Sequence, residues 1–370
     1  MDSGGAERRM QNIVQYESPQ VQVFIKSGHQ FLEKVRTFLV NAVKEGNLQQ
    51  ERASAHFKEI LHIILFYGQI HHPKIEPEEI LQESQGVFSK KYPGVFEKCR
   101  THLPTRPPFT VLLDAVVEVV QERREENVLR CLLQQINEMD VTNANNTPCG
   151  NIFVSTVINF CYFYDKVAKM RTPNYFGASV SCKGRIPREI MIDTLCYRTW
   201  HNAISRAVCV GNEYNKHAFE FPPEVLSMAF KIYTLGQRTE GNQQIDRILA
   251  RFRNRPLPRV LQIVTELRDF GCLVPRAACE RCSTMFPNIQ FHPHPRAHQA
   301  ARWEYGNCAE CESLSQLLYS DEQLATRLRC KSFQIGYDEL KRRKYKRLRH
   351  NLQQVRFPVE PEISFSNNQL

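Results

Sequence analysis

The sequence predicts a mainly α-helical protein, in which a multi-helix N-terminal body is followed by a small α+β module and a basic C-terminal helix. Three observations support this division. Apolar residues recur at helical spacing through the first 270 residues. Cysteine, histidine and proline are concentrated between residues 271 and 311. Seven of the nine residues from 341 to 349 are Lys or Arg.

The clearest helical signal lies at 21–43, where apolar residues follow the i, i+3, i+4, i+7 spacing of one helix face. Further helices are expected at 50–67, 78–88 and 109–139, with a break in the last near the charged residues 121–127. The loop 141–151 is rich in Asn, Thr, Pro and Gly, and the body can divide there. Residues 21–270 are thus expected to be an all-α body, whose later helices lie at 152–170, 187–208, 223–235, 243–253 and 260–270.

Composition favours an intracellular protein in the nucleus, the cytoplasm or both. The first 20 residues are polar, lack the apolar stretch of a secretory signal, and are expected to be a disordered tail. No run of about 18 apolar residues occurs, so a membrane span is not expected. Thirteen cysteines without a secretory signal indicate reduced thiols rather than a disulfide framework. Seven of these are scattered singly and are expected to behave as small hydrophobic residues: Cys99, Cys131, Cys149, Cys161, Cys182, Cys196 and Cys209.

Residues 271–337 are predicted to form a zinc-binding module, because they contain two C-x2-C pairs separated by 25 residues. Structural zinc takes four ligands in a tetrahedron, and a C-x2-C pair supplies two of them from one side. The expected ligands are Cys279, Cys282, Cys308 and Cys311. The intervening segments IQF and AARWEY suggest a hairpin, and a helix is expected after the second pair. This order at 279–318 resembles a treble-clef zinc finger.

Three histidines lie in the segment between the cysteine pairs: His292, His294 and His298. They are interpreted as exposed loop residues, although any of them could replace a cysteine as a ligand or contact an anion. Cys272 and Cys330 are nearby in the sequence but lack paired spacing, so they receive no role.

The segment YGNCAECESLSQLL at 305–318, with the preceding hairpin-like stretch from 289, resembles the cytidine deaminase-like superfamily. The resemblance implies that Cys308 binds zinc at a helix start and that Glu310 acts as general acid and base. It also implies two further ligands from a C-x-x-C pair downstream, yet only Cys330 follows Cys311. Either the site is degenerate, or the upstream Cys279 and Cys282 complete it, with Cys311 as a further ligand that could close the fourth position.

The basic helix and tail are expected at 338–370. The formal net charge of the chain is +10, and the run KRRKYKRLR alone carries seven of these charges. A concentrated basic patch attracts polyanions and also matches a nuclear import signal. A solvated surface helix is the alternative. The residues of this basic run are Lys341, Arg342, Arg343, Lys344, Lys346, Arg347 and Arg349.

Two functions follow from these features. The leading hypothesis is a non-enzymatic interaction or scaffold protein, in which Zn²⁺ holds the C-terminal module and the basic run contacts nucleic acid, an acidic protein or a nuclear import receptor. The rival hypothesis is a zinc-dependent nucleoside or nucleobase deaminase-like protein, active or degenerate, that uses Cys308 and Glu310. The number of protein ligands on the metal separates them, since catalysis requires an open position.

Overall fold

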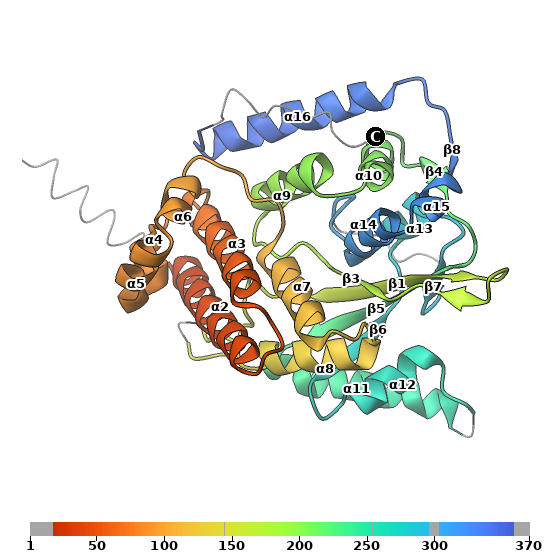
Figure 1. Cartoon of the computed structure of the whole chain (residues 1–370), viewed down its shortest axis with the longest axis horizontal. Coiled ribbons are helices and arrows are strands. Elements are labelled where there is room, and N and C mark those ends of the chain that lie inside the picture. Colours follow the sequence, from red (N-terminus) through yellow and green to blue (C-terminus); the bar gives the residue numbers. More distant parts are fainter. Residues whose placement is uncertain (1–17, 144, 254, 296–302, 359–370) are drawn as a thin grey trace, which may run out of the picture.

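The computed structural model describes residues 18–143, 145–253, 255–295 and 303–358, and its N-terminal part is a group of helices (Figure 1). The helix predicted at 21–43 is confirmed, and its apolar stripe is buried. The break predicted near 121–127 is also confirmed, since the expected long helix is divided there. The helical elements of this part are α2 (Pro19–Lys44), α3 (Gln50–Gln69), α4 (Pro77–Leu81), η1 (Gln82–Ser84), α5 (Gln85–Lys91), α6 (Pro93–Lys98), α7 (Pro108–Val120) and α8 (Glu125–Ile136).

The prediction of an all-α body is wrong, because strands lie between residues 157 and 233 where only helices were expected. The two longest have the sequences VINFCYFYD and VLSMAFKIY, which are nearly continuous apolar runs. A strand that is buried on both faces lacks the alternation of a half-exposed strand, so its periodicity cannot be told from that of a buried helix. These strands are β1 (Val157–Asp165), β2 (Met170–Arg171), β3 (Tyr175–Ala178), β4 (Phe219–Glu220) and β5 (Val225–Tyr233).

A six-stranded sheet forms the centre of the fold, in the order β2-β1-β5-β6 with β3 also paired to β1 and β7 to β5. β6 (Cys272–Arg276) runs antiparallel to β5, whereas β7 (Gln290–His292) runs parallel to it. These two strands come from the predicted zinc module, so this module shares its sheet with the preceding part of the chain. A separate small sheet joins β4 to β8 (Arg329–Cys330).

Helices cover both faces of the central sheet (Figure 1). α14 packs on β1 and β3 of one face, whereas α11 and α12 pack against β6. Above α14 in Figure 1, the C-terminal helix α16 lies across α9 and α10. The elements involved are α9 (Arg185–Arg198), α10 (Asn202–Tyr214), η2 (Leu235–Gln237), α11 (Arg238–Leu249), η3 (Ala250–Phe252), α12 (Arg259–Glu266), α13 (Glu280–Met285), α14 (Ala309–Ser320), α15 (Glu322–Thr326) and α16 (Tyr337–Gln354).

The start of α14 lies unusually close to the sheet. A Cβ atom added to Gly177 of β3 would be 2.5 Å from both the Ala309 carbonyl oxygen and the Ser313 amide nitrogen. Such distances are shorter than real carbon contacts, so only glycine permits this approach. The close packing fixes the first turn of α14, which carries the residues discussed below.

Of the predicted hairpin, the stretch around Gln290–His292 forms β7, which pairs with β5, and the described residues 303–305 form no strand. Residues 300–302 and His298 lie outside the described residues, as do most of the predicted N-terminal tail (1–17) and the end of the C-terminal tail (359–370). No helix within the described ranges is both long and apolar enough to cross a membrane.

Candidate metal centre

Three of the four predicted cysteine ligands come together in space. The sulfur atoms of Cys279, Cys282 and Cys308 all lie within 4.8 Å of one another. Cys279 Sγ and Cys308 Sγ are 3.5 Å apart, although 28 residues separate them in the sequence. Cys279 and Cys282 are buried, and Cys308 is half-buried. We call these residues the three-cysteine cluster.

Local structure explains how each sulfur is presented. Cys279 is the N-cap of α13 and Cys282 lies one turn further, so the two side chains share a face of the short helix. Cys308 is the N-cap of α14, with an extended backbone conformation. The free N–H groups and the dipole at the start of this 12-residue helix favour a negative charge on the sulfur. The cluster therefore joins the N-terminus of α14 to the short helix α13.

The cluster lowers the cost of ionising one thiol. Hydrogen bonds from Cys282 and Cys308 lower the pKa of Cys279. The same contact with Cys279 raises the pKa of Cys282 and of Cys308, because two thiols then share their protons with one thiolate. A divalent cation can replace these shared protons and neutralise all three sulfurs.

Glu310 is buried next to the cluster, with 5% of its surface exposed. Burial and the charge of Cys279 raise the pKa of its carboxyl to about 7, while a contact with the Cys282 side chain opposes this rise. A carboxyl group with such a pKa can both accept and donate a proton near neutral pH. Glu310 is not a member of the three-sulfur group, so it is placed beside the cluster rather than within it.

Cys311, the fourth predicted ligand, lies outside the three-cysteine cluster. It is fully buried on α14, and burial, together with the charges of Glu310 and Cys196, raises the pKa of its thiol. The other candidates also lie outside that group. His292 is half-buried in β7, His294 is exposed, Cys272 is buried in β6 and Cys330 is exposed in β8.

Two supporting residues were not predicted from the sequence. The indole N–H of Trp303 donates to Cys308 Sγ over 3.2 Å, a hydrogen bond that stabilises a thiolate. Below α14, the Asn159 amide accepts from Ser313 Oγ at 2.6 Å and donates to Ser227 Oγ at 2.8 Å. The same Ser313 hydroxyl donates to the Glu310 carbonyl oxygen at 3.2 Å. No spacing rule signals these contacts, because Trp303 lies outside both C-x2-C pairs and Asn159 comes from a distant strand.

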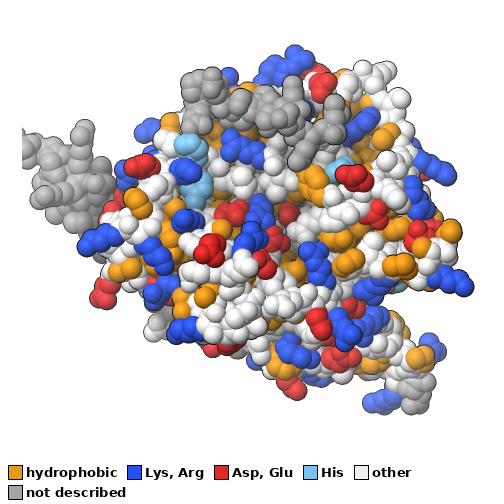
Figure 2. Space-filling view, in the orientation of Figure 1, with side chains coloured by type: hydrophobic (Ala, Val, Ile, Leu, Met, Phe, Trp, Pro, Cys, Tyr) orange, Lys and Arg blue, Asp and Glu red, His pale blue; other side chains and the backbone are white. Residues whose placement is uncertain are grey.

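The basic run lies on α16, but its seven side chains do not form one free patch. Lys344 is buried, and Arg347 is half-buried. Arg342 pairs with Glu339 and Arg343 with Glu213, which leaves Lys346 and Arg349 as the exposed members without a recorded ion pair. Figure 2 shows basic and acidic side chains interspersed over this face of the molecule. The roles in nucleic-acid binding and nuclear import stay predictions.

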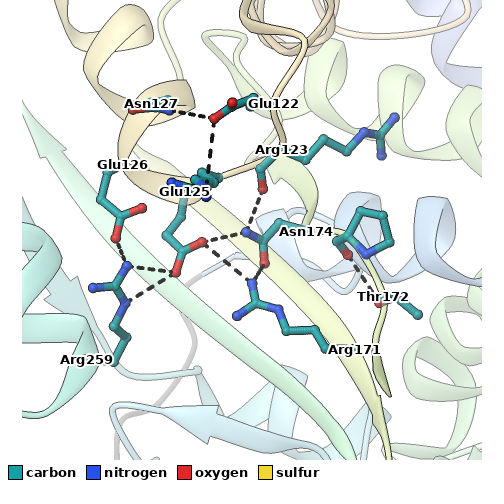
Figure 3. A pocket seen from close by; sticks show the side chains of 11 residues that line it. Glu122, Arg123, Glu125, Glu126, Asn127, Arg171, Thr172, Asn174 and Arg259 are labelled. Atoms are coloured by element: carbon teal, nitrogen blue, oxygen red, sulfur yellow. Dashed lines mark hydrogen bonds and ion pairs between the residues drawn. The ribbon is translucent and has the colours of Figure 1, made fainter. Parts of the chain in front are cut away.

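A surface cleft of about 970 Å³ lies elsewhere, between the start of α8, the β2–β3 segment and α12. Figure 3 shows the Glu125 carboxylate between the guanidinium groups of Arg171 and Arg259. Arg259 Nη2 is 3.2 Å from Glu125, and Asn174 Nδ2 donates to it at 2.6 Å. Burial alone would raise the pKa of Glu125, but these partners and a backbone N–H hold it below its ordinary value. Arg171, Arg259 and Asn174 thus satisfy the Glu125 carboxylate, which therefore does not call for a ligand.

Comparisons with known proteins give no match: no family model fits the sequence, and no curated protein or solved structure is significantly similar to it. The resemblances of 279–318 to treble-clef fingers and of 289–318 to the cytidine deaminase-like superfamily therefore stay predictions. The chemistry of the site has to be inferred from its own residues.

Proposed function

We propose that this protein is a zinc-dependent hydrolytic deaminase, which replaces the exocyclic amine of a nucleobase by a carbonyl oxygen. One observation carries the proposal: three cysteine sulfurs converge beside the buried carboxyl of Glu310, while Cys311 lies outside their group. Three protein ligands with an adjacent proton carrier are the usual composition of a catalytic zinc site, whereas a structural site has four.

The geometry of the three sulfurs fits zinc. With Zn–S distances of about 2.3 Å, two sulfurs of a tetrahedral site are about 3.8 Å apart. Cys279 Sγ and Cys308 Sγ are separated by 3.5 Å, and all three sulfurs lie within 4.8 Å of one another. Small side-chain adjustments are enough to place an ion at equal distances from them. Soft thiolate ligands also favour zinc over magnesium or calcium.

Cys279, Cys282 and Cys308 would hold the zinc ion and leave one position for a water molecule, whose pKa the metal would lower to near 7. Glu310 would accept a proton from this water and deliver it to the amine nitrogen, so its carboxyl returns to its first state. The water oxygen would bond to the ring carbon that carries the amine, and its second proton would pass to the adjacent ring nitrogen. The carbon–nitrogen bond would then break, so that ammonia leaves and a carbonyl remains. Burial raises the pKa of the Glu310 carboxyl and so favours its taking up the proton that it would then deliver.

The order of the ligands departs from the deaminase resemblance, in which the C-x-x-C pair follows the helix with Glu. Here Cys279 and Cys282 precede Cys308, and α13 precedes α14. The chain nevertheless brings the pair to the N-terminus of α14, because β6 and β7 on either side of α13 both pair with β5. A reversed order in the sequence therefore gives the ligand set that the chemistry requires.

X-ray absorption on the purified zinc-loaded protein tests the metal part of this proposal. We expect one zinc per chain, with three sulfur neighbours at about 2.3 Å and one oxygen or nitrogen at about 2.0 Å. The Cys311→Ala variant should retain this spectrum. Four sulfur neighbours in the wild type, reduced to three in Cys311→Ala, would show a closed structural site and refute the catalytic assignment.

Ammonia release tests the reaction, with cytosine and adenine nucleosides and single-stranded oligonucleotides as substrates. Glu310→Gln should retain zinc but lose turnover by a factor of about 100 or more, because the proton carrier is gone. Equal, nonzero turnover in the variant would remove Glu310 from the mechanism. Absence of turnover in the wild type on every substrate would favour a non-enzymatic scaffold protein.

That second function is a scaffold protein in which zinc is structural and α16 contacts nucleic acid. Four exposed basic side chains on α16 support it: Arg342, Arg343, Lys346 and Arg349. Replacing Lys346 and Arg349 by Gln should then weaken binding to a single-stranded or duplex oligonucleotide and flatten its salt dependence. Unchanged binding, or none in the wild type, would exclude nucleic acid as a partner of this helix.

A further inference from the structure

Arg347 of the basic run makes contacts that connect α16 to the metal centre. Its Nε and Nη2 atoms donate to the two carboxylate oxygens of Asp193 at 2.8 and 2.5 Å. Its remaining Nη1 atom donates to Glu304 at 3.2 Å. One guanidinium group thus joins three parts of the chain: α16, α9 and the segment that leads to Cys308.

Asp193 fixes the position of this guanidinium group. The aspartate is completely buried on α9, and Lys344 of α16 also lies 3.2 Å from its carboxylate. A buried carboxylate is costly without partners, and two parallel hydrogen bonds from arginine restrict both groups to one geometry. Asp193 therefore holds the Arg347 guanidinium in one position, where it can bind the Glu304 carboxylate.

Glu304 is four residues from Cys308, and short contacts connect the two. Its carbonyl oxygen accepts from the Asn307 N–H at 3.3 Å, which closes a turn containing Gly306 at φ +92°. Its chain neighbour Trp303 donates directly to Cys308 Sγ. A displacement of Glu304 would therefore move both the backbone that precedes Cys308 and the indole that supports its sulfur.

Other carboxylates lie near Glu304, so the positive charge of Arg347 is needed to hold it in place. Burial raises the pKa of Glu304, the charge of Arg347 opposes this, and Glu189 of α9 is in contact with the Glu304 side chain. Without the Arg347 guanidinium, Glu304 would face Glu189 and Asp193 with less compensating charge. The segment before Cys308 would then lose the ion pair that holds it to α16 and α9.

Other contacts keep this segment folded in the absence of Arg347. The Tyr305 hydroxyl is bonded to Asn215 next to α10, and the Val180 N–H donates to the Asn307 carbonyl oxygen at 3.1 Å. Loss of Arg347 should therefore shift the segment rather than unfold it.

We propose that Arg347 is a positioning residue for the three-cysteine cluster, which it serves by holding Glu304 against Asp193. Arg347, a member of the predicted nucleic-acid patch, is thereby an internal support. The inference rests on the metal site of the proposed function, but it does not depend on deaminase activity.

Metal affinity of the full chain tests this inference. We would measure zinc binding by competition with a chromophoric chelator, and cobalt(II) binding by its absorption spectrum. Arg347→Lys and Glu304→Gln should each weaken zinc binding by about tenfold, as loss of a supporting hydrogen bond does in other metal sites. Combining both substitutions should weaken it little more than either alone, because both break the same contact.

Three control variants separate positioning from general stability. Leu352→Ala removes a buried side chain of α16 more than one turn after Arg347. Lys344→Met removes a second cation from Asp193, and Arg349→Met removes an exposed charge. All three should bind zinc within about twofold of the wild type when folded, and their cobalt spectra should be unchanged. If Leu352→Ala loses as much affinity as Arg347→Lys, Arg347 has no specific role.

A metal-free measurement keeps the inference testable even if the wild type binds no zinc, a result that would by itself refute only the proposed function. The rate of Cys308 alkylation by iodoacetamide, followed by mass spectrometry, reports the position of this segment. Arg347→Lys and Glu304→Gln should accelerate alkylation of Cys308 severalfold relative to Lys344→Met. Equal rates in all variants would overturn the positioning role.

Discussion

The three-cysteine cluster and the cleft around Glu125 both gather ionisable side chains, but they balance charge in opposite ways. In the cleft, Arg171, Arg259 and Asn174 satisfy Glu125, so the group is complete within the protein (Figure 3). In the cluster, three sulfurs meet beside the buried carboxyl of Glu310, on which the charge of Arg276 acts. Thiols that share protons around one thiolate can exchange those protons for an external cation, whereas a carboxylate already paired with arginines indicates a structural role.

The largest effect should follow removal of one sulfur. Binding of zinc to structural sites is worth about 10–16 kcal/mol, or about 3 kcal/mol for each of four ligands. Cys282→Ser should therefore weaken zinc binding by more than about 100-fold. Added zinc should raise the melting temperature of the wild type but not that of the variant. If Cys282→Ser binds zinc as tightly as the wild type, the three-cysteine cluster is not the zinc site, and its contrast with the cleft is lost.

Glu125→Gln should have the second largest effect, on stability alone. The neutral amide leaves Arg171 and Arg259 without their shared carboxylate, which should cost about 1–3 kcal/mol of unfolding free energy. Urea denaturation measures this loss. Zinc content should be unchanged, because the cleft and the cluster have separate partners. A loss of zinc in Glu125→Gln would show that the two regions are not independent.

The pH dependence of stability should differ between the wild type and Glu125→Gln. The pKa of Glu125 is lowered in the folded protein, so its stabilising contribution is fully present above the unfolded value of about 4.3 and is lost as pH falls through the folded value. Urea denaturation at pH 7 and pH 4 should show the stability gap between the two proteins narrowing by about 1 kcal/mol or less in acid. A gap that widens at low pH would contradict the assigned direction of the shift.

The smallest effect should come from Trp303→Phe, which removes the hydrogen bond to Cys308 Sγ but keeps an aromatic ring. Zinc affinity should fall by about threefold to tenfold, below the loss expected for a ligand. The sulfur-to-cobalt absorption band of the cobalt(II) protein should also shift, because the thiolate loses a donor. No change in affinity or spectrum would limit Trp303 to packing.

Local patterns in the sequence predicted much of the site, but not which of the four cysteines belong to the cluster. Two C-x2-C pairs located the metal centre, and both pairs have the same local form, with the first cysteine as a helix N-cap and the second one turn later. Because their local geometry is alike, nothing in the spacing tells Cys282, inside the cluster, from Cys311, outside it. The hypothesis of a structural zinc site takes Cys311 as the fourth ligand, whereas the proposal of catalysis takes that position as open.

Strands and buried charges were the main failures of prediction. β1 and β5 are apolar runs whose neighbours in the sheet, not their own periodicity, make them strands. Lys344 and Arg347 belong to a run that suggested an exposed patch. Both instead pair with the buried carboxylate of Asp193, which lies more than 150 positions earlier in the sequence. Counting charges along the sequence cannot reveal an ion pair with such a distant residue.

The sequence by itself determined the amphipathic N-terminal helices, the basic C-terminal run and the kind of residue that could bind a metal. These features depend on neighbours within a few positions, where helical spacing and cysteine pairing act. Tertiary structure alone decided which three sulfurs meet, that Glu310 is buried beside them, and that part of the basic run supports the segment before Cys308. Each of these depends on burial and on contacts between distant segments, and both arise only when the sheet and its covering helices pack together.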